Sequence, residues 1–250
     1  MARDFTLDIF KKLLQAGIDE DYIFTSYENY LDSESHNKVF ILRHDVDRKP
    51  QNAYRTALIE NQMGITGTYY FRTTGKSFNE DLIEQIIKLG HEIGYHYEDF
   101  ALNNGNLEKS IQSFEKNLTA LRKFYPVKTI CMHGSPLSKW DNRKMWEYFD
   151  YKRFDIIADP YFDIDFNTIL YLSDTGRTWD NQKGNVRDKV NTKLNLNLSS
   201  TFDIISALRE KKLPSRILLN LHPQRWTDDW FHWTVELISQ KVKNKIKDLV

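Results

Sequence analysis

The stretch from Lys38 to Asp47, KVFILRHDVD, constrains the fold of this chain more than any other part of the sequence. It begins with four β-forming apolar residues, Val39 to Leu42, and ends in ionisable side chains. A continuous apolar run of this length is typical of a strand that is buried on both faces, as in parallel sheets. Parallel α/β folds place their chemistry at the carboxyl ends of such strands. The stretch therefore predicts a parallel α/β architecture with a functional site at its charged end.

Segments typical of strands and helices alternate at least five times along the chain, which favours a parallel α/β arrangement. Apolar runs predict further strands at 66–73, 91–100, 127–132, 155–158, 168–172 and 216–223. A helix is expected from 142 to 149, and the polar, Asn-rich segment 176–200 is expected to be a long loop with at most one edge strand in LNLNL. No linker and no internal repeat divides the sequence, so we expect one domain over residues 1–250.

The charge balance and the apolar runs exclude several classes of protein. The chain has 35 basic and 35 acidic residues, which removes the basic footprint of a nucleic-acid binder. Cys131 is the only cysteine, which excludes an internal disulfide framework and fits a reducing compartment. The first 17 residues indicate an amphipathic helix rather than a secretion signal, and no run approaches the roughly 20 apolar residues of a membrane span. We therefore expect a cytoplasmic protein whose basic C-terminal run, KVKNKIKDLV, is a solvated helix face.

Ionisable side chains gather at the predicted strand ends: Arg43, Asp45, Asp47, His96, Glu98, His133 and His222. In a barrel, the carboxyl ends of parallel strands meet on one rim. Carboxylate together with imidazole is the mixture that zinc, cobalt or iron accepts when one coordination position stays open for water. Such a metal polarises a carbonyl and lowers the pKa of a bound water, while a free Asp accepts a proton and a His donates one to the leaving group. The pattern therefore indicates a metal or acid/base site.

Each of these residues also has a purely structural interpretation. Asp45 and Asp47 are close enough in extended chain to repel one another, and Arg43 or Lys49 alone can neutralise the pair. His222 can be a buried residue that is bonded to a carboxylate, and Trp226 can serve in packing. We favour the functional interpretation because several strand ends converge on the same two carboxylates.

Three motifs together resemble the NodB-type polysaccharide deacetylase family, which is similar to carbohydrate esterase family 4. These motifs are RHDVD after the first strand, GHEIGYH from Gly90 to His96, and the apolar strand LLNLHP that ends at His222. The resemblance runs from about Phe40 to Trp226, which is most of the chain. It implies a distorted (β/α)7 barrel of the polysaccharide deacetylase type and a metal-dependent enzyme that removes N- or O-acetyl groups from glycans.

The resemblance also implies roles for individual residues. Asp45 corresponds to the catalytic base and Asp47 to a metal ligand, His96 is a second ligand, and His222 is the catalytic acid. The metal is expected to be zinc, with cobalt, nickel, iron or manganese as alternatives. The residues expected to contact the substrate are Arg43, which orients Asp45 or a substrate anion, His133 and Trp226, whose ring can stack on a sugar.

The chain departs from the family pattern at one ligand. Four residues after His96, where the family places its second metal-binding His, this chain has Phe100, which cannot bind a metal. Glu98 is the expected substitute because it has the same strand parity as His96, and His133 is the other candidate. If neither binds, the chain is a non-catalytic relative.

The first function hypothesis is therefore a metal-dependent carbohydrate deacetylase. Without a secretion signal, its expected substrate is a cytoplasmic precursor of a surface polysaccharide or lipopolysaccharide, such as a nucleotide sugar or a lipid-linked sugar. The second hypothesis is a barrel that binds a sugar or glycan intermediate without hydrolysing it. The third is hydrolysis of an amide that is not a carbohydrate, because the same groups can attack other carbonyls.

Overall fold

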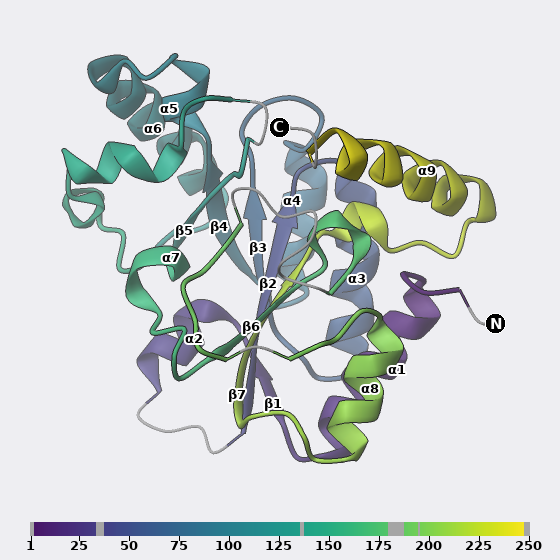
Figure 1. The fold of residues 1–250 in the computed structure, drawn as a ribbon. Coiled ribbons are helices and arrows are strands. Elements are labelled where there is room, and N and C mark those ends of the chain that lie inside the picture. Colours follow the sequence, from purple (N-terminus) through teal and green to yellow (C-terminus); the bar gives the residue numbers. More distant parts are fainter. Residues whose placement is uncertain (1–2, 34–37, 136–137, 180–187, 195, 248–250) are drawn as a thin grey trace.

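The computed structural model describes residues 3–33, 38–135, 138–179, 188–194 and 196–247. In these residues seven parallel strands form one sheet with helices around it (Figure 1). The strands are β1 (Ile23–Thr25), β2 (Val39–Val46), β3 (Thr68–Phe71), β4 (Glu92–Tyr97), β5 (Ile130–Met132), β6 (Leu170–Ser173) and β7 (Arg216–Leu221). This is the distorted (β/α)7 barrel that the sequence predicts.

The strand β2 is the centre of the sheet, whose order is β5-β4-β3-β2-β7-β6. All eight residues of β2 are buried. One edge of β2 pairs with β7 along Val39–His44, while the other pairs first with β1 along Val39–Ile41 and then with β3 along Arg43–Val46. Within the described residues β5 and β6 do not pair with each other; Thr129, beside β5, forms a parallel bridge with Ala158 instead. The barrel is therefore open on this side.

The α-helices connect and cover the strands: α1 (Leu7–Asp19), α2 (Tyr27–Asp32), α3 (Pro50–Gln62), α4 (Glu80–Lys88), α5 (Asp99–Leu102), α6 (Leu107–Arg122), α7 (Pro160–Asp163), α8 (Thr201–Arg209) and α9 (Trp230–Lys247). Short 3-10 helices are η1 (Asn142–Glu147), η2 (Tyr151–Phe154), η3 (Thr175–Arg177) and η4 (Pro223–Arg225). Polar side chains cap the N-termini of several of these helices. The Asn106 side chain accepts the N–H of Lys109, and Ser200 and Asp203 form a capping box at α8.

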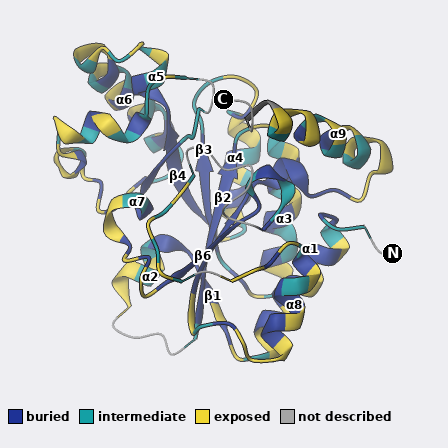
Figure 2. Ribbon diagram, viewed as in Figure 1, coloured by how far each residue is buried: buried dark blue, intermediate teal, exposed yellow. Residues whose placement is uncertain are grey.

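The apolar core lies between the sheet and these helices, so the strands are almost wholly buried whereas the outer helix faces are exposed (Figure 2). On one side α1 and α8 pack on the sheet through residues such as Phe10 and Ile204. On another, α4 and α6 contribute Ile83 and Phe114 to a second cluster. No helix in the described residues has a stretch long and apolar enough to cross a bilayer.

Some local expectations from the sequence need correction. Residues 155–158 form no strand beyond the Ala158 bridge, and the helix expected over 142–149 is a 3-10 helix that ends at Glu147. The predicted strand over 91–100 ends at Tyr97. In LNLNL, residue 195 lies outside the described residues and its described neighbours are not in a strand. These segments are short, so the contacts of the folded chain decide their geometry more than their local pattern does.

Gly94 of the GHEIGYH motif has a packing role. A Cβ atom on Gly94 would overlap the ring of Tyr70 on the neighbouring strand β3 and would lie 3.1 Å from the carbonyl oxygen of Thr129. The motif therefore lets β3, β4 and the segment before β5 approach closely, and this places His96 two residues further along β4.

Candidate metal centre

Asp45 lies near the carboxyl end of β2 and is tied to a guanidinium from the same strand. The Nε of Arg43 donates to Asp45 Oδ1 at 2.9 Å, and an Nη donates to Oδ2 at 2.7 Å. Asn220 on β7 donates to Oδ2 at 3.2 Å. Burial alone would raise the pKa of Asp45, but the charge of Arg43 outweighs it and the pKa falls to about 2. Asp45 is therefore an anion in a fixed orientation.

Asp47 follows the end of β2, and two imidazoles converge on it. The Nε2 of His96, from β4, lies 3.4 Å from Asp47 Oδ1, and the Nε2 of His133, just past β5, also lies 3.4 Å from this oxygen. These three side chains form a group of potential metal ligands. Gln224 donates to the other carboxylate oxygen, Oδ2, at 3.1 Å.

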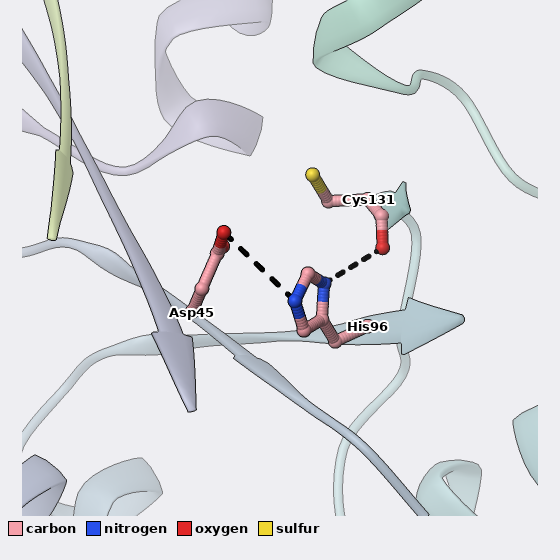
Figure 3. A group of neighbouring side chains, drawn as sticks. All are labelled: Asp45, His96 and Cys131. Atoms are coloured by element: carbon pink, nitrogen blue, oxygen red, sulfur yellow. Dashed lines mark hydrogen bonds and ion pairs between the residues drawn. The ribbon is translucent and has the colours of Figure 1, made fainter. Parts of the chain in front are cut away.

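The tautomers of the two histidines decide what can lie between these atoms. His96 Nδ1 is 2.9 Å from the carbonyl oxygen of Cys131, which can only accept, so Nδ1 carries the proton (Figure 3). His133 Nδ1 is 3.1 Å from Oε2 of Glu98, and the same reasoning applies. In neutral rings both Nε2 atoms then present lone pairs to Asp47 Oδ1, which is buried and accepts no hydrogen bond from the described residues.

This arrangement of three acceptors fits a divalent cation. Lone pairs on two nitrogens and one carboxylate oxygen repel one another unless a cation or a proton lies among them. Ligand atoms about 2.0–2.1 Å from a tetrahedral zinc stand about 3.3 Å apart, close to the two measured separations of 3.4 Å. Three protein ligands also leave a fourth position open, as in catalytic zinc sites. Asp47, His96 and His133 are thus the residues suited to hold the metal.

A second group of potential ligands, Asp45, His96 and Cys131, is less suitable (Figure 3). Both oxygens of Asp45 are already bound by Arg43. Burial raises the pKa of the Cys131 thiol well above its usual value, so the thiolate that a metal requires is disfavoured. His96 is common to both groups.

Glu98, the expected ligand, is not part of the group formed by Asp47, His96 and His133. The strand β4 ends at Tyr97, and Glu98 has left the extended conformation with φ −142° and ψ 18°, so it no longer alternates in step with His96. Its two carboxylate oxygens accept from Nε and Nη of Arg72, each at 2.8 Å, and Thr74 donates a further hydrogen bond. Burial would raise its pKa, but the hydrogen bonds from His133 and Thr74 and the charge of Arg72 lower it to about 2. Glu98 therefore lies behind His133 and orients its ring.

Phe100, at the position of the family's missing ligand, is a core residue. It lies in α5, is 5% exposed, and packs edge-on against Trp140 with 5.5 Å between the ring centroids. Phe100 therefore has a packing role, whereas His133, just past β5, approaches the carboxylate of Asp47.

His222 follows β7 on the other side of Asp45 and Asp47, and its Nε2 lies 3.9 Å from an oxygen of each. Its Nδ1 donates to Asp174 Oδ1 at 2.6 Å, and its backbone N–H donates to Asp174 Oδ2 at 3.0 Å. Arg225 donates to the same carboxylate at 2.5 Å. Burial would raise the pKa of Asp174, but Arg225 and His222 outweigh it and lower the pKa. The ring of His222 is therefore held with Nε2 toward the two aspartates.

Trp226 does not have the substrate-stacking position expected for it. Its side chain is 1% exposed, and it packs among Phe5, Phe10 and Trp179. Its indole N–H donates to Asp174 Oδ2 at 2.8 Å. Trp226 therefore helps to hold the carboxylate of Asp174, which in turn orients His222. The Trp226 ring is not accessible to a sugar.

Asp174, Arg72 and Asn220 belong to the site but are not among the residues predicted from the sequence. Asp174 directly follows β6, so it stands at a strand end like the residues that were found, and the same signal marks it. Arg43, expected to orient Asp45 or a substrate anion, does the former. One of its Nη atoms also lies 3.3 Å from the hydroxyl of Tyr161, and its side chain is buried.

Comparison with known proteins finds solved structures with a similar fold but no match by sequence. No protein-family model matches the sequence, and no curated protein matches it. Among solved structures, the chain is similar to a carbohydrate esterase family 4 (CE4) esterase from Streptococcus mutans, with 15% identity, a TM-score of 0.48, and coverage of 92% of this chain and 90% of that one. It is also similar to the catalytic domain of peptidoglycan N-acetylglucosamine deacetylase from Eubacterium rectale, with 14% identity, a TM-score of 0.48, and coverage of 84% and 87%.

A third similar structure is a CE4 family pseudoenzyme from Bacillus anthracis, with 14% identity and a TM-score of 0.45. The match covers 85% of this chain but only 62% of the pseudoenzyme, so the chain spans less than two thirds of that protein's length. Two of these three structures are described as CE4 proteins and the third as a deacetylase. At these identities and TM-scores the likeness is one of fold, and the chemistry has to follow from the chain's own side chains.

Proposed function

We propose that the chain is a metal-dependent hydrolase that removes an acetyl group from a carbohydrate. The observation that carries the proposal is Oδ1 of Asp47, which is buried, accepts no hydrogen bond from the described residues, and lies 3.4 Å from the Nε2 atoms of both His96 and His133. A binding protein for sugars has no need of two imidazoles and a carboxylate that converge in this way. Asp45 and His222 beside this group supply a proton acceptor and a proton donor.

The contacts of the residues support the following roles. A divalent metal held by Asp47, His96 and His133 would polarise the acyl carbonyl and make a nearby water more acidic. Asp45, kept ionised and oriented by Arg43, accepts the proton of the attacking water. His222 donates a proton to the departing amine or alcohol from Nε2, while the anionic Asp174 at Nδ1 fixes its tautomer and stabilises its protonated form. Glu98 and Trp226 hold this arrangement in place.

The carbohydrate part of the proposal rests on the resemblance of the three motifs to the polysaccharide deacetylases. The solved structures with a similar fold include a protein described as an N-acetylglucosamine deacetylase. We further propose that the substrate is a cytoplasmic precursor of a surface polysaccharide or lipopolysaccharide rather than a finished extracellular glycan. Zinc is the proposed metal, since two imidazoles and one carboxylate are ligands that suit it.

The test measures acetate released from a panel of N- and O-acetylated sugars, free, nucleotide-linked and lipid-linked. A second panel contains small acetylated amides that are not carbohydrates. The protein is assayed as purified, after treatment with a chelator, and after return of zinc or cobalt. We expect acetate from at least one sugar substrate, loss of activity with chelator, and recovery with metal.

Two results would overturn the proposal. Protein that binds neither zinc nor cobalt would favour a non-catalytic, sugar-binding relative. Metal-dependent hydrolysis confined to the small amides would favour an amidase that acts on other substrates.

A further inference from the structure

The outward face of α9 is apolar, although its large side chains are exposed and do not belong to the apolar core of the described residues. Phe231, Val235, Ile238 and Val242 are 73%, 48%, 58% and 53% exposed. They are spaced four, three and four residues apart, so they lie in one stripe along the helix. Trp230, 63% exposed, begins the helix beside this stripe. Figure 2 shows α9 at the periphery of the molecule.

Positive charge lines one side of this apolar stripe. At 100° per residue, Lys241 and Lys245 fall beside the stripe, and both are exposed. Lys243 is also exposed but lies toward the side of Glu236, near Arg48. Between Trp230 and Lys247 the sequence contains one carboxylate, Glu236. This residue is 5% exposed and faces inward, where Arg48 approaches it at 3.5 Å. The outer face therefore combines large apolar side chains with lysines and has no acidic residue.

The inner face of α9 anchors the helix beside the candidate metal centre. Glu236 contacts Arg48, the residue after Asp47. Asn244 donates to the carbonyl oxygen of Gly176 at 2.9 Å, and Arg177 donates to that of Trp233 at 3.0 Å. Gly176 and Arg177 belong to η3, which directly follows Asp174. Accordingly, β2 and β3 point toward the end of the molecule where α9 lies (Figure 1).

We propose that the outer face of α9 docks on an anionic lipid surface. An amphipathic helix of this kind lies in the plane of the interface, with its apolar side chains among the acyl chains. Its lysines extend to the headgroups and are attracted by their negative charge. A second copy of this chain is a poorer occupant, because two such faces would bring lysines against lysines with no carboxylate to pair them. The outer face of α9 is therefore more than the solvated helix face that the basic sequence predicts.

Docking in this way would bring the candidate metal centre close to the lipid surface, because the inner face of α9 contacts Arg48 and the segment that follows Asp174. If the chain is the proposed deacetylase, this favours a lipid-linked sugar over a soluble nucleotide sugar as its substrate. That step rests on the proposed function, whereas lipid docking does not.

The test measures co-sedimentation of the full chain with vesicles of phosphatidylcholine alone or mixed with phosphatidylglycerol. We expect binding to the anionic vesicles, weakened by high salt, and little binding to phosphatidylcholine. The paired substitutions Phe231→Ser with Ile238→Ser should weaken binding about 10-fold or more, as should Lys241→Glu with Lys245→Glu. The control pair is Tyr148→Ser with Phe162→Ser, which removes aromatics 65% and 49% exposed elsewhere on the surface and should leave binding unchanged.

Lipids with brominated acyl chains provide a second measurement. They should quench part of the tryptophan fluorescence, and Trp230→Phe should remove most of that quenching, because Trp230 is the exposed tryptophan on α9, whereas Trp233 is partly buried against Arg177. Circular dichroism establishes that each variant is folded. The Phe231 and Ile238 pair removes apolar contacts with the acyl chains, whereas the Lys241 and Lys245 pair removes attraction to the headgroups, so each pair tests the proposal independently.

Three results would overturn the proposal: no binding of the wild type to anionic vesicles, binding that neither α9 pair weakens, or a lipid-free dimer that the Phe231 and Ile238 substitutions dissociate. The last would assign the face to a second copy of the chain. Vesicle binding requires no turnover and is measured on metal-free protein as well. Docking without acetate release would therefore count against the proposed enzyme function alone, and acetate release without docking against this inference alone.

Discussion

The Nδ1 of His133 lies 3.1 Å from Oε2 of Glu98, so the two candidates for the third ligand are bonded to each other. The Nε2 of the same ring faces Asp47 at 3.4 Å. His133 is therefore the member of this pair that faces the proposed metal position, and the carboxylate of Glu98 orients its ring from the other side. A carboxylate that accepts the second N–H of a metal-binding His is a common arrangement.

Metal content should separate these two roles. We expect His133→Ala to lose most of its metal, because one of three ligands is gone. Glu98→Ala should retain the site but bind the metal about 10–100-fold more weakly. The measurement is zinc titration of metal-free protein, with His232→Ala as the control because this histidine is exposed and pairs with Asp229 rather than with Asp47. Normal metal binding by His133→Ala together with loss in Glu98→Ala would reverse the assignment.

Asp45→Asn should abolish turnover while metal stays bound. Loss of a general base lowers kcat by about 10²–10⁴-fold, and the three proposed ligands are untouched. The variant leaves the buried Arg43 without its anionic partner, so we also expect lower stability. Acetate release and metal content are measured on the same sample below its unfolding temperature. Activity equal to that of the wild type would exclude Asp45 as the base.

Asp174→Asn should lower kcat on the order of 10–100-fold with little change in metal content. The substitution removes the negative charge that stabilises protonated His222 and fixes its tautomer. Steady-state kinetics on a sugar substrate checks this expectation. Asp8→Asn is the control, because Asp8 is exposed on α1 and far from the site in the fold. An unchanged kcat would show that His222 needs no carboxylate partner.

Asp159 should make the stability of the protein fall as pH rises. Burial is the main cause that raises its pKa, to about 7, although hydrogen bonds from Tyr97 and Tyr161 oppose it. Because its pKa is near 3.9 in the unfolded chain, the folded state binds the proton more tightly, and this stability is lost between about pH 4 and 7. Asp159→Asn removes the effect, since an amide does not titrate.

Denaturant unfolding at pH 5 and pH 8 measures this effect. We expect the stability of Asp159→Asn relative to the wild type to rise by about 1–3 kcal/mol between the two pH values. A constant difference would show that Asp159 is ionised at pH 5 in the folded protein.

Gly94→Ala should destabilise the fold by about 1–3 kcal/mol, the usual cost of forcing an extra carbon into a packed core. The new Cβ would overlap the ring of Tyr70. A double-mutant cycle with Tyr70→Leu checks this reason, because the smaller side chain should reduce the cost of the added methyl group. An equal cost in both backgrounds would place the strain against the Thr129 carbonyl instead.

Much of the site could be predicted because it depends on strand ends. The apolar run before Asp45 and Asp47 indicates the position of β2, and the same reasoning applies to His96 and His222. The same reasoning gives the wrong side-chain direction for Glu98. Side chains alternate regularly only while the chain is extended, and β4 ends at Tyr97, one residue before Glu98. Nothing local in the sequence marks that stop.

Other features depend on contacts between distant segments. Trp226 is expected at the substrate, but its ring is buried by Phe5 and Phe10 from the beginning of the chain. Its N–H reaches Asp174, which lies 52 residues away in sequence. A single sequence does not show such pairings, and so an aromatic residue near a catalytic motif is easily taken for a substrate contact.

The pairing of β2 with β7 has a consequence for how the chain is made. The central strand, complete by residue 46, finds the partner for one of its edges only in residues 216–221, and β6 pairs with β7 as well. During synthesis, that edge of β2 stays unpaired until residues 216–221 have left the ribosome. Pairing across so long a stretch is also slow. Nascent chains of this protein are therefore expected to depend on chaperones, and chains that end before β7 to aggregate rather than fold in part.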